Sequence, residues 1–396
     1  MSKAGTLSHM TTGMIVVIVG YTSSVAIVFQ AALAANASAT QISSWLWALG
    51  IGMGISTIGL SLRYRTPILT AWSTPGAALL VTGLSGVPMN EAVGVFIVAS
   101  LAMLVLGISG IFDRLMRHIP QPLAAAMLAG ILTKFGMDLF VAMGTERLMV
   151  ISMLLAFLLL RSPLPRYAIP LTLIAGLAIA ATQGNIDTQQ LEWSITTPTF
   201  TLPSFELTSL IGVGVPLLIV NIASQNMPGL AVLRANGYHT PASPLISWTG
   251  LTSLILAPFG CFSIGLAAIT AAICMGKEAD PNPALRYKAS VWAGIFYLGA
   301  GIFGATVASL FAALPNELVL AIAGLALLGT IGNSLHGALA GGDSREAALI
   351  TFLVTASGLT LFDVGSAFWG ITFGLLAWHL RDGIKPRRVK VTAAER

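Results

Sequence analysis

Residues 184–206 read GNIDTQQLEWSITTPTFTLPSFE, and this stretch is the one long polar connection in an otherwise apolar chain. It contains Asp187, Glu192 and Glu206 but no Lys or Arg. The sequence on either side is divided into apolar stretches, many of them near the length of about 20 residues that a membrane-spanning helix needs. We therefore expect 184–206 to link two membrane-embedded halves, residues 11–183 and 207–382.

Each half contains seven apolar stretches. The predicted spans are residues 11–34, 43–61, 67–85, 91–111, 120–140, 148–160, 166–183, 207–232, 243–257, 258–276, 285–311, 315–340, 345–360 and 362–380. An odd number of spans in each half puts the two halves in opposite orientations, which is the inverted-repeat plan of many secondary transporters. The sequence therefore predicts an all-α polytopic membrane protein with fourteen spans in two inverted seven-span repeats.

The composition excludes an ordinary soluble domain, because 56% of the residues are hydrophobic and only 9% are charged. No CxxC, HExxH or P-loop pattern is present, and Cys261 and Cys274 lie in one apolar segment, where lone cysteines act as small hydrophobes. The sequence has no clustered titratable residues of the kind that catalysis requires. We therefore expect no enzyme activity, no catalytic residue, no metal and no cofactor.

Basic residues gather in every second gap between the spans. They are Lys3, Arg63, Arg65, Arg114, Arg117, Arg161, Arg166, Arg234, Lys277, Arg286, Lys288, Arg345, Arg381, Lys385, Arg387, Arg388, Lys390 and Arg396. Only Lys134 and Arg147 break the pattern. Basic loops stay on the cytoplasmic side of a bilayer, so the N-terminus (1–10) and the tail (383–396) are predicted to be cytoplasmic and the 184–206 linker periplasmic. The net charge of +5 is thus a topology signal and does not indicate a nucleic-acid partner.

The third span of each half is interrupted. RTPILTAWSTPGAALLVTG (65–83) and LILAPFGCFSIGLAAITAA (254–272) each combine a β-favouring run, a Pro/Gly break and a short helix. A half-helix that starts inside the membrane leaves backbone N–H groups unpaired, and its positive dipole end attracts anions. A single break is equally well explained as a proline kink, but two breaks at matching positions favour a binding site near the middle of the membrane.

Asn221, Ser224 and Gln225 share one face of the eighth span, because they are three and four residues apart. Polar side chains at this depth either line a site or hydrogen-bond neighbouring helices. Both interpretations stay open for Asn221, whereas the adjacent Pro228-Gly229 break favours a site at Gln225.

The first span carries Tyr21, Ser23 and Ser24 at the equivalent depth, where Ser is often satisfied by backbone bonds and packing alone. The residues considered for proton coupling are His336, which can titrate near neutral pH, and Glu317. The sequence also allows His336 to be an ordinary histidine at the membrane interface, and we favour that interpretation.

Three segments resemble the benzoate membrane transporter family of bacteria, which are benzoate/proton symporters. They are GYTSSVAIVFQAALAA (20–35), TPGAALL (74–80) and ASQNMPGLAVLRANGY (223–238). That family is grouped with the nucleobase carriers and sulfate permeases. The resemblance implies fourteen spans in two inverted sevens, spans 3 and 10 built from a short strand and a half-helix, and a location in the bacterial inner membrane.

The sequence departs from the nucleobase carriers at the positions that would bind substrate. Those carriers have a Glu in span eight and another at the span-ten break, whereas this chain has Ser224-Gln225 and 261–263 (Cys-Phe-Ser) there. A site without carboxylates suits an anion better than a nucleobase. Phe259 and Phe262 are expected to stack on an aromatic ring.

The resulting hypothesis is a secondary active carrier that imports a small aromatic carboxylate together with a proton. Its expected substrate-binding residues are Tyr21, Ser24, Thr74, Pro75, Gly76, Ala77, Asn221, Gln225, Phe259, Gly260, Phe262 and Ser263. The carboxylate is expected at two half-helix N-termini, Gly76-Ala77 and Phe262-Ser263. Spans 1–4 and 8–11 would form a substrate-holding core, and spans 5–7 and 12–14 a gate.

The residues alone leave two alternatives open. One is the same fold carrying another organic or inorganic anion or a nucleobase. The other is a passive anion channel. Membrane lipid surrounds the protein in every case, and assembly as a homodimer is also open.

Overall fold

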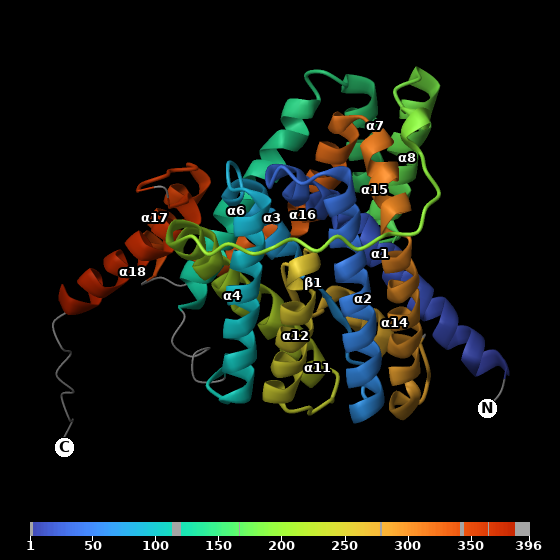
Figure 1. Cartoon of the computed structure of the whole chain (residues 1–396), viewed down its shortest axis with the longest axis horizontal. Helices are drawn as coiled ribbons and strands as arrows, with labels where there is room; N and C mark the ends of the chain where they lie inside the picture. The colour runs from blue at the N-terminus through green and yellow to red at the C-terminus, as the bar shows by residue number, and fades with distance from the viewer. Residues whose placement is uncertain are drawn as a thin grey trace, which may run out of the picture.

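The structure is a computed structural model of the whole chain, and it describes residues 3–112, 120–165, 167–277, 279–340, 344–362 and 364–384. Of the basic residues that predicted the topology, Arg114, Arg117, Arg166 and those of the tail at 385–396 lie outside the described residues. The described residues form helices joined by short connections, with one small sheet (Figure 1).

The first half of the chain contributes seven spans, the third of which is a strand followed by a half-helix. The elements are α1 (Lys3–Ala34), α2 (Ala39–Tyr64), β1 (Thr70–Trp72), α3 (Thr74–Gly83), α4 (Met89–Ile108), α6 (Gln121–Ala142), α7 (Arg147–Leu160) and α8 (Ala168–Gln183). A 3₁₀ turn, η1 (Thr188–Gln190), lies at the start of the linker that follows.

The second half repeats this plan. Its eighth span is a continuous helical path of α9 (Leu207–Ser209), η2 (Leu210–Gly214), α10 (Val215–Val220), η3 (Asn221–Asn226) and α11 (Met227–Ala235). The later elements are α12 (Ala242–Leu256), η4 (Ala257–Phe259), β2 (Ile264–Leu266), α13 (Ile269–Met275), η5 (Pro283–Leu285), α14 (Tyr287–Ile302), α15 (Gly304–Ala313), α16 (Asn316–Leu339), α17 (Arg345–Ala356) and α18 (Ser366–Ile384).

The predicted fold class is confirmed. Within the described residues, seven helical segments are long and apolar enough to cross a membrane, and the bent pair α14–α15 makes an eighth. The other spans are the two broken ones and the helices α7, α8, α17 and α18. The chain is therefore an all-α membrane protein with fourteen spans in two inverted seven-span repeats.

Two details of the spans differ from the sequence prediction. The helix of span 1 begins at Lys3 rather than at residue 11. Span 11 is bent by 65° between α14 and α15, next to Phe303. The bend falls in the run GAGIFG (299–304), whose glycines disfavour a continuous helix.

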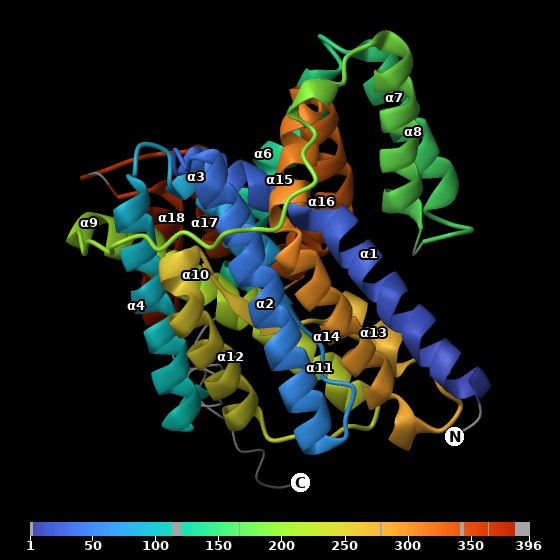
Figure 2. The ribbon, with the colours of Figure 1, turned by 45° about the vertical axis from the view of Figure 1, so that its right-hand side comes forward.

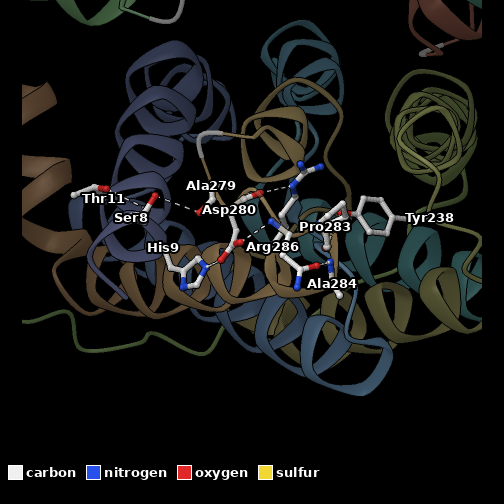
Figure 3. Close-up of polar contacts among 10 residues, drawn as sticks. Ser8, His9, Thr11, Tyr238, Ala279, Asp280, Pro283, Ala284 and Arg286 are labelled. Carbon is white, nitrogen blue, oxygen red and sulfur yellow. Dashed lines mark hydrogen bonds and ion pairs between the residues drawn. The ribbon is translucent and has the colours of Figure 1, made fainter. Parts of the chain in front are cut away.

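The extra length of α1 is explained by its contacts with the loop between spans 10 and 11. The His9 side chain is only 3% exposed, and its Nε2 lies 2.8 Å from Asp280 Oδ2. Arg286 holds the same loop by donating to the Asp280 carbonyl over 2.8 Å (Figure 3). It also donates to the Met275 carbonyl over 2.7 Å. The turn of α1 that precedes residue 11 is therefore packed against the bundle and is not a free N-terminal segment.

The helices pack in two groups. α2 and α12 contact the two strands and pack with α14 and α4 respectively, and α6, α16, α17 and α18 pack mainly with one another. The contact between α2 and α14 depends on small residues, because a Cβ atom on Gly50 would stand 2.5 Å from the Gly301 Cα. Small residues let membrane helices approach closely and gain van der Waals contact.

Candidate functional site

The two broken spans meet in an antiparallel sheet of two strands. Thr70 pairs with Leu266, Ala71 with Gly265 and Trp72 with Ile264. The Ser73 N–H donates to the Ser263 carbonyl (3.2 Å) at one end. Strands from the two repeats thus share one set of backbone hydrogen bonds inside the membrane-embedded bundle, where unpaired groups would be costly.

Hydroxyl groups from neighbouring helices accept one N–H group at the outer edge of each strand. The Thr57 hydroxyl of α2 accepts the Thr70 N–H over 3.0 Å, and the Ser253 hydroxyl of α12 accepts the Ile264 N–H over 2.9 Å. The two repeats therefore use the same arrangement, in which the preceding helix caps the strand. Each strand is thereby held in place against the helix that precedes it.

Span 8 adopts a π-helical turn, η3, where it passes the sheet. Asn226 is fully buried there, accepts the Leu266 N–H over 3.0 Å and donates to the Asn221 carbonyl over 3.0 Å. Gln225 donates to the Leu266 carbonyl over 3.2 Å. The two bonds to Leu266 fix span 8 against β2, and the bond to Asn221 lies within the π-turn. π-turns of this kind are frequent at functional sites.

A cavity of about 570 Å³ lies beside the sheet. It is lined by residues of α1, α2, β1, α3, η3, α11, α13 and α14, together with residues of α6, α8 and α16. The cavity extends to Pro165, which is exposed in the connection between α7 and α8. None of the described lining residues is charged or a histidine. The cavity is within the size range of small-molecule sites.

Aromatic side chains form one wall of the cavity. The Tyr21 ring packs edge-on against the Trp72 ring at a centroid distance of 4.7 Å and lies 6.2 Å from the Tyr297 ring. Trp72 Nε1 donates to the Ser24 hydroxyl over 2.8 Å. The Tyr21 hydroxyl is buried and has no partner among the described residues. Such an orphan donor is costly unless a ligand or water satisfies it.

Five of the twelve residues expected to bind substrate line this cavity. They are Tyr21, Ser24, Thr74, Pro75 and Gln225. Ser23 and Ser224 also line it. The other seven, which are Gly76, Ala77, Asn221, Phe259, Gly260, Phe262 and Ser263, are absent from its described lining.

Gly76 and Ala77 do not offer free N–H groups, contrary to the sequence expectation. The Gly76 N–H donates to the Ser73 hydroxyl over 3.0 Å, and the Ala77 N–H donates to the Ser73 carbonyl over 2.7 Å. Ser73 is therefore an N-cap of α3. A Cβ on Gly76 would stand 2.9 Å from the Ser73 hydroxyl and 3.0 Å from Leu217 Cδ1, so Gly76 serves the cap and the packing.

The predicted start of the second half-helix at Phe262-Ser263 is wrong. The helix α13 begins at Ile269, after the strand, and Ala268 occupies its N-cap position. Pro258 and Gly260 turn the chain before the strand, whereas Pro75-Gly76 comes after the strand in the first repeat. The residues near the α13 start that line the cavity are Ala267, Ala268, Ile269 and Thr270.

Phe259, Gly260 and Phe262 have structural surroundings. The Phe259 ring lies 5.7 Å from the Trp47 ring, and the buried Phe262 ring lies 6.0 Å from the Trp45 ring. Gly260 has a φ of 99°, and its missing side chain leaves room for the Trp45 ring. Asn221 is buried with its side-chain Oδ1 unpaired among the described residues, as is the Ser263 hydroxyl.

The two residues considered for proton coupling lie at opposite ends of α16. Glu317 is in its first turn and half-buried, and His336 is in its last turn and exposed. Neither lines the cavity. The α16 residues that do so include Thr330, Asn333 and Ser334, which the sequence analysis did not select.

A fold of two inverted seven-span repeats, with broken spans meeting beside a cavity, defines a polytopic membrane transporter. The sequence comparison then gives the family. The family model for the benzoate membrane transport protein, BenE, matches residues 4–380, and the chain belongs to this family. It is a membrane transporter and not an enzyme.

Two curated relatives match nearly the whole chain. The inner membrane protein YdcO of Escherichia coli (strain K12) is 50% identical over 375 residues, which are 95% of this chain and 96% of that protein. The benzoate membrane transport protein of Acinetobacter baylyi is 42% identical over 381 residues, which are 96% of each chain.

Solved structures share the fold at low sequence identity. The transmembrane domain of the cyanobacterial bicarbonate transporter BicA matches with a TM-score of 0.65 at 12% identity, covering 95% of this chain and 98% of that one. SLC26A9 matches with a TM-score of 0.60 at 14% identity, covering 95% of this chain and 65% of that one.

Proposed function

We propose that this transporter imports a small aromatic carboxylate together with a proton across a bacterial inner membrane. The observation that carries the proposal is the uncharged cavity with one wall of aromatic rings beside the two broken spans. An aromatic acid needs an apolar surface for its ring and a few hydrogen-bond donors for its carboxyl group. The cavity supplies both.

The donors lie near the aromatic wall. The Tyr21 hydroxyl is unpaired among the described residues, and Gln225 lines the cavity while using one side-chain N–H for the Leu266 carbonyl. Thr270 and Thr74 add hydroxyl groups at the starts of α13 and α3. In this arrangement the substrate ring lies against Trp72, and its carboxyl group faces these polar groups.

The membership of the cavity lining suggests how transport occurs. The core would be spans 1–4 and 8–11 and the gate spans 5–7 and 12–14, and the cavity has residues of both. Relative movement of core and gate would open the site to alternate sides. The gate-side residues come from the first two turns of α6, the first turn of α8 and the second half of α16, at the end that carries the basic loops. The cavity thus lies toward that end, which we assign to the cytoplasm.

Proton coupling does not need a carboxylate in the site. Because no described lining residue is acidic, we propose that the substrate carries the proton on its own carboxyl group. Uptake by His336→Gln and Glu317→Gln should therefore remain driven by a pH gradient. Loss of gradient-driven uptake in either variant, with substrate exchange intact, would show that the residue carries the proton.

The test is uptake of radiolabelled benzoate by the purified protein in liposomes. We expect saturable accumulation against a benzoate gradient when the inside is made alkaline, and competition by other aromatic acids more than by acetate or bicarbonate. A current that rises with driving force without saturation would indicate a channel. Preference for bicarbonate or another inorganic anion would assign a different cargo to the same fold.

The position of the carboxyl group is tested at Gln225. Gln225→Glu places a negative charge in an apolar cavity, so above the pKa of the substrate it should bind the benzoate anion more weakly than Gln225→Ala does. Both variants lose the bond to the Leu266 carbonyl, so the comparison isolates the charge. Equal affinity of Gln225→Glu and the unaltered protein would remove Gln225 from the carboxylate site.

A further inference from the structure

The linker between the two repeats has an unusual distribution of polarity. We call residues 191–205 the strap. Its large apolar side chains are exposed, as are Glu192 and Thr197, whereas its other hydroxyl residues are buried or half-buried against the protein. The exposed apolar side chains, with their exposed fractions, are Leu191 41%, Trp193 91%, Ile195 69%, Phe200 59%, Leu202 75% and Phe205 57%.

The inward residues bind the spans beneath them. The Thr196 N–H donates to the Ile302 carbonyl over 2.9 Å, and its hydroxyl accepts the Ala305 N–H over 2.7 Å. Thr199 exchanges bonds with the Ser44 hydroxyl, donating its N–H over 3.0 Å and accepting at its carbonyl over 3.3 Å.

The remaining contacts continue along the same flank. The Thr201 N–H donates to the Pro258 carbonyl over 2.9 Å, and the Ser204 N–H donates to the Asn90 carbonyl over 3.0 Å. The strap therefore contacts α15, α2, η4 and the start of α4 in that order. Its path past α15, α2 and α4 is visible in both views (Figures 1 and 2).

This polarity is the reverse of that of a loop in water. A water-exposed loop turns its polar side chains outward and buries its apolar ones. Here a Trp, an Ile, two Phe and two Leu point outward from one short segment, which contains no Lys or Arg. The medium outside the strap is therefore apolar for at least the depth of these side chains.

The backbone of the strap limits how deep it lies. The N–H groups of the outward residues Trp193, Ile195, Phe200 and Leu202 form no hydrogen bonds to described residues. Unpaired groups exclude a position in the hydrocarbon centre. The interfacial layer supplies both water for the backbone and an apolar environment for the rings, and it is where Trp is enriched.

The surface next to the strap supports a lipid occupant. Ile302 and Phe303, at the bend of span 11 where Thr196 binds, are 39% and 47% exposed. The apolar face of the strap is thus continuous with the apolar flank of a membrane span. We propose that the strap lies parallel to the membrane in the headgroup–acyl boundary, with its apolar side chains inserted among phospholipids.

The proposal is tested with a fluorescent probe on the strap. Trp193→Cys and Leu202→Cys, each in a Cys261→Ala/Cys274→Ala background, are labelled with a nitrobenzoxadiazole maleimide and placed in phosphatidylethanolamine–phosphatidylglycerol liposomes. Both positions face outward, so the label leaves the inward hydrogen bonds intact. Gln189→Cys in the same background is the matched control, because Gln189 is an exposed polar residue of the same linker.

We expect the strap labels to emit at shorter wavelength than the Gln189 label, to be quenched by lipids with a nitroxide near the headgroup, and to be protected from aqueous iodide. Iodide quenching equal to that of the control would overturn the proposal. Protection from both iodide and lipid nitroxides would also overturn it, because it would mean that a second copy of the chain covers the strap.

Discussion

At the scale of single residues, Tyr21 has a polar group in the cavity that the protein itself does not satisfy. Its ring is held by Trp72, but its buried hydroxyl has no partner among the described residues. Tyr21→Phe removes only this hydroxyl. A hydrogen bond to a neutral, protonated carboxyl group contributes about 0.5–1.5 kcal/mol, so benzoate affinity should fall roughly two- to tenfold. Isothermal titration of the folded variant measures the change.

The matched control for this prediction is Tyr238→Phe. The Tyr238 hydroxyl donates to the Pro283 carbonyl over 3.1 Å and lies in a connecting loop, so its loss should leave benzoate affinity unchanged (Figure 3). If Tyr21→Phe binds benzoate as tightly as the unaltered protein while Trp72→Leu does not, the aromatic wall binds the substrate and the hydroxyl does not.

Asp280, in the loop between spans 10 and 11, predicts how the stability of the fold depends on pH. Desolvation, the largest influence, favours its neutral form, but hydrogen bonds from the Asn282 N–H and from His9, with the electrostatic attraction of His9 and Lys288, lower the pKa of its carboxyl group. A carboxyl group with a lowered pKa stabilises the fold above its unfolded-state pKa, and this contribution is lost as the pH falls through the folded-state pKa.

Asp280→Asn should therefore lower the Tm at neutral pH by about 1 °C at most, because about 1 kcal/mol shifts the Tm of a chain of this length by only that much and solvent screens the interaction. The difference from the unaltered protein should shrink as the pH falls below about 3.9, the ordinary Asp pKa. Thermal unfolding in detergent across this range measures it. A Tm difference that grows on acidification would contradict this role.

At the scale of elements, the junction of span 8 with β2 depends on Asn226. Asn226→Ala leaves the buried Leu266 N–H without its partner, which costs about 1–3 kcal/mol, and it removes the side-chain bond to the Asn221 carbonyl. We expect a clear loss of thermal stability. Asn236→Ala is the control, since Asn236 is exposed and its side chain donates only to the Val232 carbonyl one turn earlier. An equal loss of thermal stability in the two variants would contradict the role of Asn226 in holding span 8 against β2.

The sequence predicted those elements whose signals are local. Apolar stretches of helix length indicated the spans, and Pro75-Gly76 correctly located the start of α3, because proline is tolerated in the first turn and limits what precedes it. In the second repeat the same signal was misleading. Pro258 and Gly260 form a turn ahead of the strand, and the start of α13 at Ile269 has neither Pro nor Gly.

The site was only partly predictable because it is assembled from distant segments. Tyr21 and Gln225 stood out as polar residues at mid-span, and both line the cavity. Trp72 and Tyr297 resemble ordinary membrane aromatics in sequence, and only tertiary packing brings them to Tyr21. Phe259 and Phe262 followed the break in sequence, yet their rings contact Trp47 and Trp45 instead of the cavity.

At the scale of the whole molecule, the charge pattern predicts the orientation in the membrane. Both termini should be cytoplasmic and the linker periplasmic. A cysteine at Thr188, in the cysteine-free background, should react with an impermeant maleimide added to intact cells. A cysteine at Arg65, in the loop after α2, should react only after the membrane is permeabilised. The reverse result would require the opposite orientation for the whole bundle.

The pairing of β1 with β2 sets an order of events during synthesis. β1 ends at Trp72 and its partner begins at Ile264, so the ribosome completes spans 4 to 9 and the linker before the pairing strand exists. In that interval the Thr57 hydroxyl of the adjacent helix can protect the Thr70 N–H, but the Leu69 carbonyl must wait for the Ala267 N–H. The nascent first repeat therefore keeps exposed strand groups in or near the translocation machinery, and late contacts of this kind slow folding. Truncated chains that end before residue 264 should accordingly be turned over faster than the full protein.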